Sequence, residues 1–305
     1  MPTATESQQQ TSSSSLKGLV ARHPVAAFLV MAFTFGWTIQ FVGVYFDFGL
    51  SLRIASSIGV IFGLALPAFL VTAAVSGKAG VRDLLGRCLR WRVGIHWYLL
   101  ALLGLLVVTL LGASAFSSLT PLETLVEKWP LFFTMFLPEI LIAVLLIQLF
   151  EETAWTGFMQ DTLQERHGPL LASLMVAPAF ALFHLMSNLL EAPQITLAFV
   201  LLGVQVILGI FLRLVIMWLY NSAGCSVLIV ALFHSAFNSV TGSGGMRFTG
   251  ELISGPEAMW IPLAVLAVVA VLVVLFTRGR LSYERERAAP GPAEAMGVAA
   301  QPRVQ

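Results

Sequence analysis

Residues 138–163 read PEILIAVLLIQLFEETAWTGFMQDTL, and this stretch decides the fold class of the chain. It is apolar over the length of about 20 residues that an α-helix needs to cross the hydrocarbon core of a bilayer. Two adjacent carboxylates, Glu151 and Glu152, nevertheless lie well inside it. A charged side chain at the centre of a membrane costs about 2.5–3.5 kcal/mol on insertion scales, so such residues are functional candidates by default. The stretch predicts a transmembrane helix that carries a buried acidic pair.

The composition of the whole chain is typical of a membrane protein. Of its 305 residues, 58% are hydrophobic and 11% are charged, whereas a soluble globular domain has about 25% charged residues. The formal net charge of +1 argues against binding of nucleic acid through a basic surface. The two cysteines, Cys88 and Cys225, lie far apart in the chain. This excludes a disulfide framework and a zinc site built from cysteines.

Eight apolar stretches are candidates for membrane spans. They cover residues 24–46, 54–75, 96–117, 138–163, 169–187, 195–220, 225–241 and 258–277. The sequence therefore predicts an all-α fold, a polytopic transmembrane bundle of about eight spans. Residues 23–281 form this domain, between a polar leader (1–22) and a tail (282–305) that are both predicted to be disordered and cytoplasmic. The first apolar run is too long for the core of a cleavable signal peptide, and we find no internal repeat.

The distribution of basic residues between the loops predicts the orientation. If the N-terminus is cytoplasmic, thirteen of the 17 Lys and Arg residues lie on the inner side, and Arg53, Lys128 and Arg247 lie on the outer side. Cytoplasmic loops of membrane proteins carry such an excess of Lys and Arg, so both termini are predicted to be cytoplasmic. The segment VRDLLGRCLRWR (81–92) fits either a basic amphipathic helix at the headgroups or an ordinary cytoplasmic loop.

The ionisable side chains that we single out within the predicted spans, together with one amide, are Glu139, Glu151, Glu152, His184, Arg213, His234 and Asn238. At about 1.5 Å per helical residue, Glu151 and His184 reach a depth of roughly 20 Å from the inner face, and His234 reaches roughly 15 Å. Two carboxylates, two imidazoles and an amide are therefore expected to converge in one layer of the membrane.

Spacing within each helix sharpens this expectation. His234 and Asn238 are four residues apart and share a helix face, and Phe180 bears the same relation to His184, beside which it would form an aromatic wall. Glu151 and Glu152 are adjacent, so they cannot point equally at one centre. One is expected to act on water or substrate, and the other to hold its neighbours by hydrogen bonds.

This set of groups suits hydrolysis of an amide bond in a shielded cavity. A carboxylate beside imidazoles can act as general base towards water. Imidazole and amide groups can bind a metal or stabilise an oxyanion. A purely structural role is the alternative at each position, because a single His or Asn in a span can form a hydrogen bond between two helices. Glu139 lies near the outer end of its span and could face headgroups. We expect Arg213 to extend its charge towards the inner face, the alternative being that it neutralises a carboxylate.

Three short motifs resemble those of a known family. Glu151–Phe158 (EETAWTGF), Phe180–His184 (FALFH) and His234–Asn238 (HSAFN) are similar, in this order, to the EExxxR, FxxxH and HxxxN motifs of the CAAX-processing and bacteriocin-protection family, which includes the type II CAAX prenyl endopeptidases. The resemblance covers about residues 75 to 240. It implies a helical core with an active site open to the cytoplasm.

The resemblance also implies roles for the motif residues. Glu151 would activate water, Glu152 would support it, and His184, His234 and Asn238 would complete the catalytic cluster. Zinc or another divalent metal held by His184, His234 and Glu151 is compatible with the motifs, as is a water molecule bound by the same groups.

The sequence departs from the family at one motif position. Thr156 stands where the family has an arginine, and a threonine cannot pair with a carboxylate by charge. Arg213 could substitute for it from another span. The departure also allows an inactive, protease-like membrane scaffold.

We therefore predict a membrane endopeptidase, by resemblance a metallopeptidase, that cuts a polypeptide reaching it from the lipid or the cytoplasm. Bacterial inner membrane is the expected location, with no nucleic-acid partner and an undetermined oligomeric state. A transporter or proton relay that uses the same buried groups is the rival from another class. It would usually show an internal repeat.

Overall fold

The computed structural model describes residues 17–46, 51–116, 120–255 and 257–284 of the chain. Every regular element in this part is helical, which confirms the predicted all-α class. Most of the predicted tail (282–305) and residues 1–16 of the predicted leader lie outside the described residues. Residues 17–22 are helical rather than disordered, because they lead directly into the first apolar span.

Six helical segments of the described residues are long and apolar enough to cross a membrane. They are α2 (Pro24–Tyr45), Ile54–Cys88, Ile95–Phe116, Phe132–His167, Pro169–Glu191 and α13 (Ile195–Ser222). Two further apolar helices are shorter in the described part: α14 (Val227–Thr241) and the Trp260–Phe276 portion of α16 (Glu257–Phe276). All eight predicted spans thus fall on helices, and the chain has the properties of an integral membrane protein. How many of them cross the bilayer stays a prediction, as does the orientation.

Several of the long segments are divided by π-helical turns. The segment up to Cys88 consists of α3 (Leu52–Val60), η1 (Ile61–Ala65) and α4 (Leu66–Cys88). The next consists of α5 (Ile95–Leu99), η2 (Leu100–Gly104) and α6 (Leu105–Phe116). The segment with the acidic pair consists of η3 (Phe132–Phe136), α8 (Leu137–Ala143), η4 (Val144–Gln148), α9 (Leu149–Ala154), η5 (Trp155–Gln160) and α10 (Asp161–His167). Pro169–Glu191 consists of α11 (Pro169–Phe183) and α12 (Leu185–Glu191). The remaining elements are α7 (Thr120–Glu127), η6 (Ser243–Gly245) and α15 (Phe248–Leu252).

Helix α14 is the centre of the bundle. Nearly all of its side chains are buried, and it packs against α8, α9, α13 and α6. The hydroxyl of Ser226 caps its first turn by accepting a hydrogen bond from the Ile229 amide. Because α14 lies between the helix of the acidic pair and α13, its polar side chains face the carboxylates.

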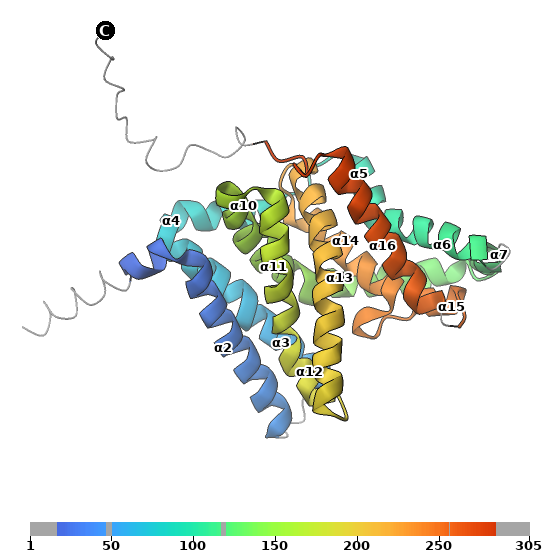
Figure 1. The fold of residues 1–305 in the computed structure, drawn as a ribbon, viewed down its shortest axis with the longest axis horizontal. Coiled ribbons are helices and arrows are strands. Elements are labelled where there is room, and N and C mark those ends of the chain that lie inside the picture. Colours follow the sequence, from blue (N-terminus) through green and yellow to red (C-terminus); the bar gives the residue numbers. More distant parts are fainter. Residues whose placement is uncertain (1–16, 47–50, 117–119, 256, 285–305) are drawn as a thin grey trace, which may run out of the picture.

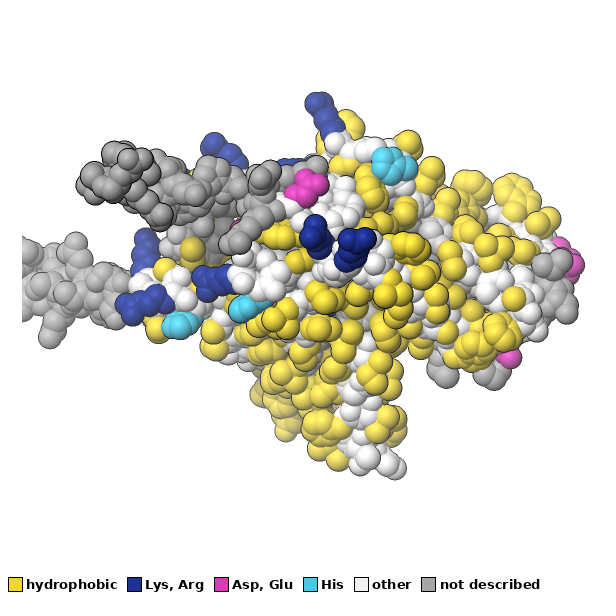
Figure 2. All heavy atoms as spheres, turned by 45° about the horizontal axis from the view of Figure 1, so that its top comes forward, with side chains coloured by type: hydrophobic (Ala, Val, Ile, Leu, Met, Phe, Trp, Pro, Cys, Tyr) yellow, Lys and Arg dark blue, Asp and Glu magenta, His cyan; other side chains and the backbone are white. Residues whose placement is uncertain are grey.

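The bundle has two distinct ends (Figure 1). At the upper end in this view lie α10, the final turns of α4, and α5. At the lower end lie the last turn of α2, α12 and the first turn of α13. Figure 2 shows Lys and Arg side chains on the upper end, which that view turns forward, and none on the lower projection. We call the upper end the basic end and the opposite one the far end.

The segment 81–92 packs on the protein at the basic end. Gly77 has a φ of 62°, which bends α4 and lets its last turns run across the bundle. Leu84 and Cys88 are buried there. Arg87 donates hydrogen bonds to Asp161 and to the Tyr220 hydroxyl. The segment is therefore a docked amphipathic helix up to Cys88, and only its last residues form a loop.

Candidate functional site

The adjacent glutamates of α9 point to different surroundings. Glu151 lines an interior cavity, and its residue is 4% exposed. Glu152 is fully buried outside that lining, among side chains of other helices. Successive residues of a helix are turned by about 100°, so the two carboxylates cannot share one direction. This arrangement is compatible with the prediction that one carboxylate acts on water or substrate and the other positions its neighbours by hydrogen bonds.

Glu152 forms a bidentate ion pair with Arg213 of α13. Arg213 Nη2 lies 2.7 Å from Glu152 Oε1, and Arg213 Nη1 lies 2.9 Å from Glu152 Oε2. Both side chains are completely buried. The expectation that Arg213 extends to the inner face is therefore wrong, and the alternative of a neutralised carboxylate holds. A buried guanidinium needs a counter-charge nearby, and Glu152 supplies it.

Thr156 joins this ion pair. Its hydroxyl donates to Glu152 Oε2 and accepts a hydrogen bond of 3.2 Å from Arg213 Nη1. The guanidinium that the family carries on the helix of the acidic pair is thus supplied by α13, next to the threonine that stands at the motif position. Arg213 therefore contacts both Glu152 and Thr156, and its substitution for the motif arginine stays a prediction.

His234 of α14 connects the two carboxylates. Its Nδ1–H donates to Glu152 Oε1 at 2.7 Å, and Nδ1 is 3.8 Å from Glu151 Oε2. The histidine is 3% exposed and lines the cavity. A ring whose Nδ1–H is held by a carboxylate has a fixed orientation and tautomer, with Nε2 left to act.

His184 follows the last residue of α11 and is held by the backbone. Its Nδ1–H donates to the Phe180 carbonyl at 2.9 Å. The Phe180 ring centroid lies 4.9 Å from that of His184 and 5.8 Å from that of His234. The Arg213 guanidinium lies 4.5 Å above the same ring, in a cation–π contact. The predicted aromatic wall therefore touches both imidazoles and the buried cation.

One cavity of about 910 Å³ brings the predicted residues together. Glu151, Phe180, His184, His234 and Asn238 all line it, from α9, α11 and α14. Glu152, Thr156 and Arg213 lie outside the lining, and Glu152 contacts His234 from there. The expected convergence of acid, imidazole and amide groups on one pocket is what the described side chains show.

Two further polar residues of the cavity were missed or misplaced by the sequence reasoning. Gln148 lies one turn before Glu151, is 4% exposed, and its Oε1 accepts no hydrogen bond within the described structure. The sequence feature that could have identified Gln148 is a polar amide within an apolar stretch. Glu139 lines the cavity, where it accepts hydrogen bonds from the Ser239 hydroxyl and the Arg247 amide, both at 3.1 Å. It is therefore part of the interior surface instead of a headgroup contact.

The donors for a metal do not meet in this conformation. In the described part of the chain, no three His, Cys, Asp or Glu side chains come together as a group that could hold a metal ion. A protein zinc site needs at least three such ligands at about 2.0–2.3 Å. His184, His234 and Glu151 share the cavity wall but do not form such a cluster. We therefore derive no step through a metal.

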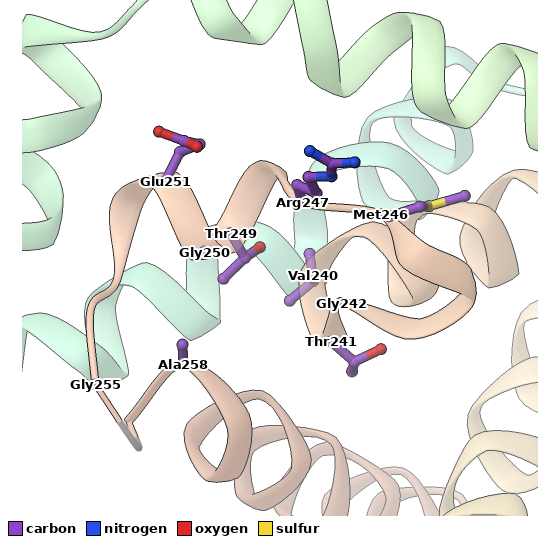
Figure 3. Close-up of a pocket in the computed structure, with 10 residues that line it drawn as sticks. All are labelled: Val240, Thr241, Gly242, Met246, Arg247, Thr249, Gly250, Glu251, Gly255 and Ala258. Atoms are coloured by element: carbon purple, nitrogen blue, oxygen red, sulfur yellow. The ribbon is translucent and has the colours of Figure 1, made fainter. Parts of the chain in front are cut away.

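A smaller cavity of about 400 Å³ lies next to the first (Figure 3) and shares Met246 with it. Figure 3 shows Arg247 and Glu251 as its charged lining residues. Glu251 forms an exposed ion pair with Lys128 at 3.2 Å. This cavity has no acid–imidazole cluster in its lining, so it is not the candidate active site.

The fold and the cavity define a class: polytopic helical membrane proteins with a buried cluster of acid, imidazole and amide groups. Residues 132–240 match the family model of the Rce1-like type II CAAX prenyl endopeptidases, and all three motifs lie within this segment. The segment is a domain of the CAAX protease family, a family of proteases, and the resemblance seen in the sequence is confirmed. No curated protein matches the chain.

Proposed function

We propose that this chain is an intramembrane endopeptidase in which Glu151 acts as general base towards water. One observation carries the proposal: of the two buried glutamates, Glu152 is locked in a bidentate ion pair, whereas Glu151 lies on the cavity surface beside an imidazole. A general base must reach the proton that it removes. The family to which residues 132–240 belong supports peptide hydrolysis as the reaction.

The other residues of the cluster have complementary roles in this proposal. Glu152 receives the Nδ1–H of His234 and thereby orients the ring, as a buried carboxylate does in hydrolytic triads. The Nε2 atom of His234 then exchanges protons with water or with the leaving amine. Asn238, four residues further along α14, offers amide N–H groups to the oxyanion that develops on the scissile carbonyl.

Water is the nucleophile in this proposal. No cysteine is among the described residues that line the cavity. Cys88 is buried in the packing of α4 and Cys225 lies in the turn before α14.

The substrate that fits this site is a membrane-associated polypeptide, and a bacterial inner membrane remains the proposed location. A prenyl group on the substrate is not required by any feature of the described cavity. The argument for an inactive scaffold was that Thr156 replaces the motif arginine and leaves the acidic pair without a cation. Arg213 supplies a cation to Glu152, which weakens this argument. A transporter is distinguished by the assay below.

The test is peptide cleavage by the detergent-purified chain and by Glu151→Gln. Glutamine keeps the size and polarity of the side chain but cannot accept the proton, so we expect a loss of about 10²–10⁴-fold in cleavage rate, with the thermal unfolding midpoint near wild type. Glu127→Gln, at an exposed glutamate of α7, is the matched control and should cleave like wild type. Equal cleavage by the Glu151 and Glu127 variants would remove the mechanism, and transport without cleavage would favour the rival class.

A further inference from the structure

Gln148 is a buried polar residue of the cavity to which the proposed function gives no role. It is the last residue of η4 and directly precedes α9, and it is 4% exposed. Its side-chain oxygen Oε1 is buried and accepts no hydrogen bond within the described part of the chain. Among the buried side-chain atoms of the described residues that lack a hydrogen-bond partner, Gln148 Oε1 is the one that belongs to a lining residue of the Glu151 cavity. An unpaired acceptor is therefore present in the wall of this cavity.

The other buried glutamines of the bundle behave differently. Gln40, Gln160 and Gln164, the other three in the described part of the chain, all form hydrogen bonds through their side-chain amides. Leaving a buried acceptor unpaired costs folding stability, and buried polar groups of native proteins nearly always have a partner. An apolar side chain of the same size would avoid this cost. Gln148 thus marks a position where a molecule bound in the cavity supplies the missing hydrogen.

The position of Gln148 relative to Glu151 indicates which molecule this is. Gln148 precedes Glu151 by three residues and has helical backbone angles, with φ −65° and ψ −31°. Side chains three residues apart on a helix are neighbours, with about 5–6 Å between their Cβ atoms, and both of these residues line the cavity. The turn that carries Gln148 also packs against α14, the helix of His234. The unpaired oxygen and the proposed general base therefore belong to the same part of the cavity wall.

One water molecule fits between two such acceptors. Water has two O–H donors, and each forms a hydrogen bond of about 2.7–2.8 Å to an acceptor oxygen. Two oxygens that accept from the same water are therefore about 4.5 Å apart. Neighbouring Gln and Glu side chains can place their oxygens at this separation.

We propose that Gln148 is a further catalytic residue, which accepts a hydrogen bond from the attacking water while Glu151 accepts the other. This inference rests on the proposed function, in which Glu151 is the general base. With both hydrogens directed at the wall, a lone pair of the water oxygen points away from α9 and into the cavity, where the scissile carbonyl is bound. Orientation of a nucleophile in this way lowers the barrier because less freedom is lost in the transition state.

The proton and electron balance of the step is complete with these groups. The water oxygen forms the new C–O bond, and the π electrons of the carbonyl move to the carbonyl oxygen. One proton passes to Glu151, and the other stays on the water oxygen, where it is held by Gln148 Oε1. Breakage of the C–N bond then releases the amine, which takes up the proton that Glu151 had accepted. Gln148 itself gains and loses no proton.

The test is steady-state cleavage by the detergent-purified Gln148→Met chain. Methionine is unbranched and similar in length, but its thioether is a weak acceptor. We expect kcat to fall about 10–100-fold, since the water loses its orientation. KM should stay near the wild-type value, because the lost contact is made to the nucleophile. The thermal unfolding midpoint should equal or exceed that of wild type, because the substitution removes an unpaired buried oxygen.

Gln164→Met is the matched control. Gln164 is 2% exposed and lies outside the lining, and its amide bonds to Asp161 and Asn221. Its replacement should lower the unfolding midpoint and leave kcat near wild type. The two variants therefore separate a residue that acts on water from one that serves only the packing of the bundle.

A second measurement uses Glu151→Gln as the background. If both residues hold one water, Gln148→Met should cost much less in this background than in wild type, because groups that act as a unit are not additive. The same fold loss in both backgrounds would overturn the shared water.

Two further results would count against the inference. A Gln148→Met chain that cleaves like wild type, while Glu151→Gln does not, overturns it and leaves the proposed function intact. A raised KM at unchanged kcat would show that Gln148 binds the peptide instead of the nucleophile. Cleavage by Glu151→Gln at the wild-type rate would overturn the proposed function itself, and the oriented water with it.

Discussion

At the scale of single residues, the ion pair between Glu152 and Arg213 explains how the chain lacks the motif arginine and keeps its charge balance. The guanidinium comes from α13 instead of the helix of the acidic pair, and Thr156 forms hydrogen bonds with both members of the ion pair. The position of a charge matters more here than the residue that supplies it. A carboxylate buried without a partner would be strongly disfavoured, so the pair is a condition for the buried cluster.

Removing one member of this pair should destabilise the fold more than removing both. We expect Arg213→Met to cost about 3–5 kcal/mol, since it leaves the Glu152 carboxylate buried without its cationic partner. Adding Glu152→Gln to Arg213→Met should recover part of this loss, which gives a non-additive cycle. The free energy of unfolding in detergent measures both effects.

The exposed pair between Lys128 and Glu251, with both side chains 44% exposed, is the control for this cycle. Lys128→Met should change stability by less than about 1 kcal/mol, because exposed ion pairs contribute little. Strict additivity of Arg213→Met and Glu152→Gln would show that the two side chains are not coupled.

The placement of the imidazoles predicts a cleavage reaction that does not depend on a tightly bound metal. Because no described trio of possible ligands forms a cluster, we expect less than stoichiometric metal in the purified chain and unchanged cleavage after chelation. Metal analysis together with the chelator assay checks this. One zinc ion per purified chain, absent from both His184→Ala and His234→Ala, would contradict this prediction and would support the metal site that the motifs allow.

At the scale of helical elements, the acidic pair lies between two π-helical turns, η4 and η5. Each π turn inserts a residue and shifts the faces of the helix that follows, and such turns are frequent at functional sites. The spacing of apolar residues in 138–163 alone therefore could not predict the direction in which the Glu151 side chain points.

Small residues allow helices elsewhere in the bundle to lie close together. A Cβ on Gly63 of η1 would lie 2.5 Å from Gly36 Cα on α2.

This close approach predicts a strong response to a single methyl group. Gly63→Ala should lower the thermal unfolding midpoint, because the added Cβ meets backbone that cannot move aside and overpacking costs about 1–3 kcal/mol. Gly203→Ala in α13 is the matched control, since nothing lies within 4 Å of its added Cβ. It should be neutral or slightly stabilising, because alanine is the better helix former. Equal midpoints for the two variants would contradict the tight crossing of α2 and η1.

At the scale of the whole molecule, Glu151, His184 and His234 line one cavity inside the helical bundle. Helices of opposite direction contribute to this cavity. Lys and Arg side chains gather at the basic end of the bundle (Figure 2).

The sequence alone determined the class of the protein and the members of its site. Hydropathy placed the helices because the bilayer demands apolar runs of a set length. The scarcity of charge within those runs singled out Glu151, Glu152, His184, Arg213 and His234, and the three motifs gave the family that residues 132–240 match.

The tertiary structure decided which side chains meet and which of them line one cavity. That Arg213 pairs with Glu152, that His234 bridges the two carboxylates, and that Glu139 faces the interior all depend on contacts between helices far apart in the sequence. Local patterns report the face of one helix, whereas these contacts depend on how helices rotate and cross one another, which π turns and close glycine contacts set. The cavity itself is a property of the packed bundle as a whole, because it lies where the packing of the helices leaves space unfilled.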